Sequence, residues 1–365
     1  MLRLATYNVE NLFDRPAILN LKDSQQTNVL LGKVSELQSL IDKPVYSDSD
    51  KAAIFSLYFE LNRYIEIQED VGKLFTRRGM ALDRVSADGR GDWYGGIQFR
   101  RAQFGDQQRI NTATMIKKVN ADIQCLIEVE GNQALDDFNS KLMARRFQQH
   151  LSIDSPIDPR GIDIGLYLRK AKMGRIRTNA FDKKGARSIW SRDCLEVECL
   201  LPSGRSLFLL INHFKSKFGG DTPDALAKRK GQSERVLQIL AERYDPKKDL
   251  YAVVGDLNDT PDSTAIAPLM GSPLVRDVMD VAQRSPDDRW TYYYGGNPKP
   301  KRMTQIDYVL VSPALAKLVK GVDIMRRGMT AVAEGKIPGI TPYEEFAGFS
   351  TAASDHAAVV VDLDL

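Results

Sequence analysis

A short apolar run leads directly into a polar turn in Tyr251-Ala252-Val253-Val254-Gly255-Asp256-Leu257-Asn258. The length of the run and its β-branched residues favour a buried strand over a helix. Asp256 and Asn258 therefore follow a predicted strand, where a loop exposes them. The same arrangement recurs along the chain.

Short apolar runs alternate with helical patterns from about residue 108 onward. Helices are predicted near 110–119 and 232–244, where apolar residues repeat every three or four positions. Strands are predicted at the start of the chain and at 123–127, 164–168, 194–201, 207–212, 251–254, 306–311 and 357–363. So many strands with few helices between them indicate a layered α+β sandwich rather than an alternating, doubly wound sheet.

The region from about 20 to 106 has a different character. Ile54, Leu57, Leu61 and Ile65 predict an amphipathic helix, and the Gly- and Asp-rich stretch 89–96 predicts a loop. We interpret the region as a helical insertion after the first strand, packed on the main fold. Residues 1–365 would then form a single catalytic domain.

The composition is that of a globular protein, with 43% hydrophobic residues, 27% charged residues and a net charge of +3. These values exclude disorder, a collagen-like repeat and a disulfide-stapled module. The longest aliphatic or aromatic run, Leu207–Ile211, is far shorter than the roughly 18 residues of a membrane-spanning helix. No export signal is visible, and Cys125, Cys194 and Cys199 lack CxxC spacing. We therefore expect a cytoplasmic protein with buried, reduced thiols.

Positive charge is concentrated in residues 169–192, which contain nine Lys or Arg and one acid, Asp182, for a net charge of +8. This segment either forms a lip that attracts a polyanion or is a solvated hairpin with alternating exposed side chains. Composition alone leaves both interpretations open.

Five carboxylates and two histidines lie beside the ends of predicted strands: Glu128, Asp163, His213, Asp256, Asp307, Asp355 and His356. Any one of them alone is more simply a turn or cap residue. However, two of the chain's three histidines are in this set. The third, His150, lies in a polar helical context, and we assign it to the surface. The combination predicts a site.

Six short motifs contain most of these residues and occur in a fixed order: Thr6-Tyr7-Asn8-Val9-Glu10-Asn11, Ile127-Glu128-Val129, Asn212-His213-Phe214, Gly255-Asp256-Leu257-Asn258, Ile306-Asp307-Tyr308 and Ser354-Asp355-His356. In this order they resemble the endonuclease/exonuclease/phosphatase superfamily, which has the deoxyribonuclease I-like fold. The resemblance spans both ends of the chain and leaves mainly 20–106 uncovered. It implies a four-layered α/β/β/α sandwich of two packed, mostly antiparallel sheets.

Grouping the carboxylates in one cleft requires a compensating charge. Two like charges 4 Å apart repel by roughly 4 kcal/mol at an effective dielectric constant near 20. Mg²⁺ or Mn²⁺ removes this cost and suits carboxylate, amide and water ligands. The resemblance implies that Glu128 is the principal metal ligand, with Asn8 and Asp355 close to the ion.

The resemblance also implies roles for the histidines. His356 would be the general base, kept in the correct tautomer by Asp307. His213 would face the scissile phosphate and stabilise charge on its oxygens, with Asp163 as its partner. Water would attack phosphorus in line, without a covalent enzyme intermediate.

Asp256 and Asn258 would orient the attacking water or bind a second ion. Asp256 could instead take the proton in place of His356, and the sequence leaves both assignments open. Gln305 stands where an Arg is common in the family, so a phosphate or base contact is expected to be missing.

An aromatic stretch, 290–294, resembles the one near the nucleotide pocket of family members that act on DNA, and Lys299 and Lys301 follow it. Trp290 and Tyr292 are predicted to bind substrate, because aromatic faces stack on bases. Alternating Tyr side chains also suit a strand packed on the core, and this alternative stays open.

Asn212, Lys215 and Arg229 are expected to bind substrate beside His213, where further basic residues add positive charge. We therefore expect a metal-dependent phosphodiesterase, in the first place a nuclease acting on DNA or RNA, with nucleic acid as its partner and no membrane. One alternative is an inositol-phosphate or lipid phosphoesterase. A second is a non-catalytic nucleic-acid-binding module of the same fold, although binding alone does not demand two histidine–acid pairs.

Overall fold

The computed structural model describes residues 1–365 except 11–16, 22–23, 80, 101–105, 156–160, 186, 218–221, 296–301, 347 and 349–350. The chain divides into two compact units, one formed by Met1–Phe13 with Gly105–Leu365 and the other by Asp14–Phe104. The second unit corresponds closely to the region interpreted as an insertion. That the whole chain is a single catalytic domain stays a prediction.

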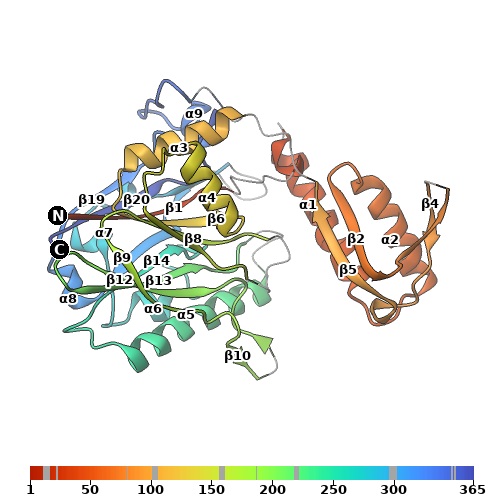
Figure 1. Cartoon of the computed structure of the whole chain (residues 1–365), viewed down its shortest axis with the longest axis horizontal. Coiled ribbons are helices and arrows are strands. Elements are labelled where there is room, and N and C mark those ends of the chain that lie inside the picture. Colours follow the sequence, from red (N-terminus) through yellow and green to blue (C-terminus); the bar gives the residue numbers. More distant parts are fainter. Residues whose placement is uncertain are drawn as a thin grey trace. The chain divides into compact units, whose positions relative to one another are not determined.

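The first unit contains two six-stranded sheets (Figure 1). The first sheet is built, in spatial order, from β19 (Val319–Met325), β20 (Ala358–Leu363), β1 (Leu2–Asn8), β6 (Ile123–Val129), β8 (Asp163–Leu168) and β7 (Gln149–Ser152). β1 and β6 are parallel, and the other neighbours are antiparallel. Strands near the two ends of the chain, β1 and β20, are therefore paired in the middle of this sheet.

The second sheet is built, in spatial order, from β15 (Arg276–Asp277), β18 (Asp307–Val311), β14 (Leu250–Asp256), β13 (Ser206–His213), β12 (Cys194–Leu200) and β9 (Lys172–Arg177). Only β13 and β14 run parallel among these neighbours. Both sheets are thus mostly antiparallel, as predicted.

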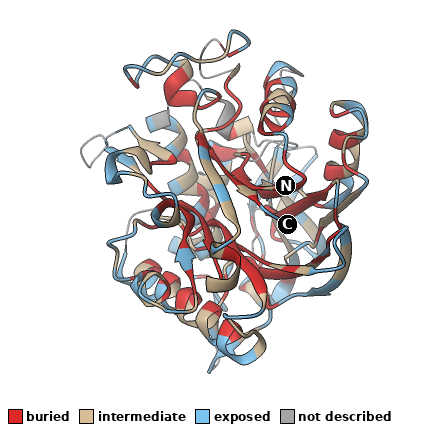
Figure 2. Cartoon of the chain, turned by 90° about the vertical axis from the view of Figure 1, so that its left-hand side faces the viewer, coloured by how far each residue is buried: buried red, intermediate tan, exposed pale blue. Residues whose placement is uncertain are grey.

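The two sheets pack face to face around a shared core. One buried cluster joins Leu4 and Ile127 of the first sheet to Leu209 and Val254 of the second, and Figure 2 shows buried residues concentrated in these strands. Two further clusters pack helices on the outer faces: α3 (Asp106–Val119) and α4 (Asn132–Lys141) on the first sheet, α5 (Pro223–Arg243) and α6 (Ala267–Met270) on the second. This arrangement confirms the predicted α+β sandwich.

The predicted strands all occur, with ends that differ by at most two residues. α5, however, begins at Pro223 rather than at 232, because the side chain of Thr222 accepts a hydrogen bond from Ala225 N and proline suits the first helical position. The helical context predicted for His150 is wrong, since this half-buried residue lies in β7 and pairs with β8.

The second unit has its own apolar core. Its elements are η1 (Ala17–Asn20), α1 (Ser24–Ile41), α2 (Asp48–Leu61), a sheet of β2 (Ile65–Gly72) with β5 (Trp93–Phe99), a sheet of β3 (Phe75–Arg78) with β4 (Ala81–Val85), and η2 (Arg90–Asp92). The loop predicted at 89–96 is therefore wrong in part, because β5 pairs with β2 there. Gly95 permits this pairing, since a Cβ atom at that position would lie 1.9 Å from the carbonyl oxygen of Gln68.

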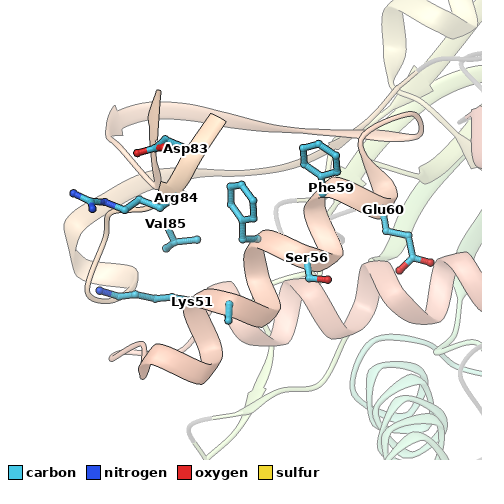
Figure 3. A pocket seen from close by; sticks show the side chains of 9 residues that line it. Lys51, Ser56, Phe59, Glu60, Asp83, Arg84 and Val85 are labelled. Atoms are coloured by element: carbon cyan, nitrogen blue, oxygen red, sulfur yellow. The ribbon is translucent and has the colours of Figure 1, made fainter. Parts of the chain in front are cut away.

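A hollow of about 780 Å³ opens between α2 and β4 in this unit (Figure 3). Phe55 and Phe59 line it, with Lys51, Arg84 and Glu60 around them. None of the predicted site residues lies in this unit.

The remaining elements of the first unit are short: β10 (Lys183–Lys184), β11 (Arg187–Ser188), α7 (Val278–Val281), η3 (Pro286–Asp288), β16 (Tyr292–Tyr294), β17 (Arg302–Thr304), α8 (Pro313–Ala316) and α9 (Thr330–Ala333). Across the described ranges, no helix combines the length and the apolar character needed to span a bilayer. Cys125, Cys194 and Cys199 are free and buried, and burial raises the pKa of each thiol.

Candidate active site

The predicted acids and histidines gather where strands of both sheets end. In the second sheet, His213 on β13 is opposite Asp256 on β14, and Asp256 is opposite Asp307 on β18. These three residues therefore occupy adjacent positions at one end of the sheet. In the first sheet, Asn8 is the last residue of β1, beside the end of β6 that carries Glu128.

His356 lies immediately before β20 and contacts Asp307. Nδ1 of His356 is 2.8 Å from Oδ2 of Asp307, and both side chains are buried. An ionised carboxylate only accepts hydrogen bonds, so the ring hydrogen lies on Nδ1. Nε2 is then directed toward two other carboxylates, 4.0 Å from Asp256 and 3.8 Å from Asp355.

The second histidine bridges carboxylates from the two sheets. Nε2 of His213 lies 3.6 Å from Oε1 of Glu128 and 3.8 Å from Oδ2 of Asp256, and the ring is almost completely buried. The packed sandwich therefore brings Glu128 and Asp256 to one imidazole, although they lie in different sheets.

Glu128 has an unusual backbone conformation. Its φ is +69°, and the pairing of β6 with β8 shifts register between Ile127 and Val129. A non-glycine residue in the left-handed region costs about 1–2 kcal/mol, and such bulges redirect a side chain near active sites. The backbone therefore departs from regular strand geometry at Glu128, the predicted metal ligand.

Amide groups surround Asp256. The side chain of Asn8 donates to its Oδ2 over 3.2 Å, and the backbone N–H of Asn258 donates to its Oδ1 over 2.8 Å. The Asn258 side chain donates to the carbonyl of Phe214 over 3.2 Å. Asn258 therefore ties the loop after β14 to the segment that follows His213.

Burial and neighbouring charges shift the pKa values of two side chains at this site, Asp256 and His356. Burial, reinforced by the charge of Asp307, raises the pKa of Asp256 well above its ordinary value. Burial lowers the pKa of His356, but the charges of Asp307 and Asp355 raise it by more, so the net pKa lies well above its ordinary value. Both shifts favour the protonated side chains, and a bound cation would oppose them.

The donor set fits a hard divalent cation. Asp256, Asp307 and His356 each offer one ligand atom, and these atoms lie within 4.8 Å of one another. Oδ1 of Asp307 is buried and accepts no hydrogen bond from the described part of the chain. Clustered carboxylate oxygens of this kind suit Mg²⁺ or Mn²⁺.

Comparison with known proteins agrees with this geometry. Residues 93–356, more than half of the chain, match the model of the Endonuclease/Exonuclease/phosphatase family. This chain belongs to the endonuclease/exonuclease/phosphatase family. The activities in the family's description all cleave phosphoester bonds. No curated protein matches the chain.

Two solved structures of D. rerio TDP2 share the fold. D. rerio TDP2 humanised by 14 mutations has a TM-score of 0.51 at 16% identity, covering 72% of this chain and 94% of its own. D. rerio TDP2 complexed with a single-strand DNA product has a TM-score of 0.50 at 15% identity, covering 70% and 91%. The human Nocturnin catalytic domain with bound sulfate has a TM-score of 0.49 at 15% identity, covering 72% and 87%.

Three other predicted residues lie on β8, on β13 or shortly after β13. Asp163 begins β8 opposite Val129, and its Oδ1 accepts a hydrogen bond from Ser155 N over 2.7 Å. Asn212 is fully buried, and its side chain donates to a backbone carbonyl in its own strand. Lys215 is half-buried, two residues after His213.

Arg229, predicted to bind substrate, is engaged in a buried ion pair. Its side chain on α5 is fully buried, and its Nε lies 2.8 Å from the buried carboxylate of Asp259. Lys217 also pairs with Asp259. A buried guanidinium needs such a partner, so Arg229 holds together the loops that follow His213 and Asp256.

Two residues of the aromatic stretch 290–294 lie in different places, one in the core and one at the candidate site. Trp290 is buried in the core between the sheets, with the guanidinium of Arg326 4.3 Å from its ring centroid, and its contact with substrate stays a prediction. Tyr292 instead packs beside His356, with ring centroids 4.9 Å apart. Lys299 and Lys301 lie outside the described residues.

Much of the positive charge in 169–192 is already paired. Arg169 bonds Asp122, Arg175 and Arg177 lie near acids on β12, and the guanidinium of Arg192 is buried against the carbonyl of Phe214. A continuous basic lip along the whole segment is therefore absent from the described structure, and unpaired charge remains mainly in the hairpin of β10 and β11.

Sequence reasoning missed two residues that hold the site together. Ser354 Oγ donates to the carbonyl of Asn8 over 2.7 Å and accepts from the backbone N–H of His356 over 3.0 Å. Glu10 accepts a hydrogen bond from the backbone N–H of Asp355 over 3.1 Å. Both residues lie inside the quoted motifs, but their role depends on the pairing of β1 with β20, which the motifs do not reveal.

Proposed function

We propose that this protein is a metal-dependent phosphodiesterase that hydrolyses DNA or RNA by in-line attack of water on phosphorus. The observation that carries the proposal is the His356–Asp307 contact of 2.8 Å beside Asp256. Membership of a phosphoester-hydrolysing family supports it.

The proposed chemistry assigns a task to each side chain. His356 accepts the proton of the attacking water at Nε2, because Asp307 holds the hydrogen on Nδ1. His213 donates to a phosphate oxygen and stabilises its charge as the pentacovalent state forms. Asn8 and Asn258 orient Asp256, which is the alternative acceptor of the proton.

The proposed metal is Mg²⁺ or Mn²⁺, held by Glu128 and Asp355 close to Asn8, with Asp256 and Asp307 within reach. When bound, it would neutralise the carboxylates and the charge that develops on the phosphate. Burial first, and then the charge of Asp307, raise the pKa of Asp256, and a bound cation would offset both effects by stabilising the ionised carboxylate.

Three observations favour a nucleic acid over a small phosphoester. Tyr292 places an aromatic ring beside His356, where a base can stack. One family member of the same fold was solved with a single-strand DNA product. The exposed cations of the β10–β11 hairpin add attraction for a polyanion.

The test is hydrolysis by the purified full chain. The protein is incubated with Mg²⁺ or Mn²⁺ and plasmid DNA, single-stranded RNA, an abasic duplex or inositol polyphosphates, and parallel samples contain EDTA. His356→Ala removes the proposed base, and His150→Ala on β7 is the matched histidine control. We expect nucleic-acid cleavage that EDTA and His356→Ala abolish and His150→Ala retains.

Other outcomes contradict the proposal in different ways. Phosphate release from inositol polyphosphates alone would identify a phosphomonoesterase. Salt-sensitive binding of nucleic acid without turnover would identify a binding module.

A further inference from the structure

The connection between β9 and β12 forms a small hairpin that stands away from the sheets. β10 and β11 pair in antiparallel fashion, with Lys183 opposite Ser188 and Lys184 opposite Arg187. Figure 1 shows this hairpin projecting from the first unit near α5. We call residues 181–188, all described except 186, the hairpin arm.

The hairpin arm combines positive charge with an aromatic ring. Lys183, Lys184 and Arg187 are exposed, and Phe181 leaves 69% of its surface in contact with solvent. Lys184 has only a long, exposed contact with Glu234, at 3.7 Å. Among the described residues, neither Lys183 nor Arg187 has a carboxylate within 4 Å.

The one acid of the hairpin arm, Asp182, is paired with a cation of α5. Asp182 accepts a hydrogen bond from Arg235 Nε on α5 over 2.7 Å. The ammonium of Lys228, also on α5, donates to the carbonyl of Ser188. α5 thus anchors the hairpin arm, while Lys183, Lys184 and Arg187 remain exposed.

The base of the hairpin arm joins the candidate active site. Trp190 is buried 6.4 Å from the ring of Phe214, which directly follows His213. The guanidinium of Arg192 donates to the carbonyl of Phe214 over 2.9 Å, and Phe214 N donates to the carbonyl of Asp256 over 2.9 Å. The arm therefore leaves the body of the protein at the segment that positions His213.

We propose that the hairpin arm binds single-stranded nucleic acid that extends beyond the catalytic site, with Phe181 stacking on a base and Lys183, Lys184 and Arg187 contacting phosphates. This inference rests on the proposed function and names its substrate class. Unpaired bases are specified because an exposed ring can stack only on a base that is not enclosed in a duplex. Spaced cations alone would suit any polyanion.

The experiment measures binding separately from cleavage. Fluorescence anisotropy of a labelled 20-nucleotide oligo(dT) is recorded in EDTA at several NaCl concentrations with the full chain. The variants are Phe181→Ala and the triple variant Lys183→Ala/Lys184→Ala/Arg187→Ala. The matched control, Arg205→Ala/Lys247→Ala/Lys248→Ala, removes three exposed cations elsewhere in the first unit.

Two signatures are expected. The arm triple variant weakens binding and reduces the slope of log Kd against log [NaCl] by about 2, since each phosphate contact on a single strand contributes about 0.7. Phe181→Ala raises Kd about fivefold or more without changing the slope. The control triple variant keeps both Kd and slope near those of the wild type.

Several results would overturn the inference. One is an equal loss of oligo(dT) affinity in the two triple variants. Another is tighter binding of a 20-base-pair duplex that does not depend on Phe181. A third is binding only to anionic lipid vesicles.

Cleavage of bis(p-nitrophenyl) phosphate, which is too small to reach the arm, separates failure of the arm inference from failure of the proposed function. If the diester is cleaved but the arm variants bind oligo(dT) normally, only the arm inference fails; if oligo(dT) binding depends on the arm but nothing is cleaved, only the proposed function fails.

Discussion

Ser354 Oγ donates a hydrogen bond to the carbonyl oxygen of Asn8 over 2.7 Å, and both residues are buried. The same hydroxyl accepts from the backbone N–H of His356. One hydroxyl therefore joins the end of β1 to the segment that carries the proposed base. The contact links two motifs that are 346 residues apart in the sequence.

Ser354→Ala should impair both stability and turnover. A buried hydrogen-bonding group that loses its partner costs about 1–3 kcal/mol, so the free energy of unfolding in urea should fall by that amount. The value of kcat should fall more than KM rises, because His356 loses its fixed position. Ser140→Ala on α4 should change neither. Unchanged kcat in Ser354→Ala would show that the hydroxyl does not position the base.

Asp307→Asn should remove the control of the His356 tautomer. A general base contributes about 10²–10⁴-fold to rate, so we expect kcat to fall by about 10²-fold or more with a smaller change in KM. Circular dichroism and the melting temperature would report whether the fold is kept, and Asp323→Asn on exposed β19 is the matched control. A kcat within about twofold of the wild type would assign the proton to Asp256 instead.

The divalent cation should displace protons when it binds. Because burial and Asp307 raise the pKa of Asp256, the metal-free site carries a proton near neutral pH that the cation must release. Mn²⁺ affinity should therefore increase with pH. Calorimetry in buffers of different ionisation enthalpy measures the proton release directly.

Glu128→Gln should weaken Mn²⁺ binding, since the amide lacks the charge of the carboxylate. The increase in melting temperature caused by Mn²⁺ should shrink in this variant, whereas Glu198→Gln on the second sheet should behave as the wild type. Equal thermal shifts in both variants would exclude Glu128 as a ligand.

Asp277→Asn should stabilise the protein near neutral pH. Burial raises the pKa of Asp277 to about 6, from an unfolded value of 3.8. The folded state keeps its proton between these values, so its stability falls as pH rises from 3.8 through 6, by at most about 3 kcal/mol at 1.36 kcal/mol per unit.

The asparagine variant avoids this loss, because its amide cannot ionise. Gln305 now donates to Asp277 over 2.9 Å, and its own side-chain oxygen is unbonded among the described residues. A flip of the Gln305 amide can therefore satisfy the new side chain. Urea denaturation should show equal stability of both proteins at pH 4 and a more stable variant, by about 1–3 kcal/mol, at pH 7.

The strands and the site segments could be predicted because they are local patterns. A buried β-branched run such as 251–254 has few alternatives to a strand, and the polar turn that follows it carries its own signature. The six motifs come together only because the two sheets pack against each other. The family resemblance indicated this convergence, which the hydrophobic periodicity could not predict.

Other features depend on contacts between distant residues. Arg229 looks like a surface cation on a helix, and only the buried Asp259 reveals that it is a structural residue. Trp290 differs from Tyr292 because Trp290 packs in the core between the sheets, whereas Tyr292 packs beside His356. The bulge at Glu128 leaves no mark in the local sequence, since a glutamate in the left-handed region is sustained by its surroundings.

The pairing of β1 with β20 has a consequence for biosynthesis. During synthesis on the ribosome, β1 is made before β20. β1 therefore lacks this antiparallel partner until residue 363 has left the exit tunnel. Before that moment Asn8 has no Ser354 to contact, and the imidazole of His356 has not been placed. The proposed base is therefore positioned only after β20 has formed, and the proposed hydrolytic activity would be acquired at that point of synthesis.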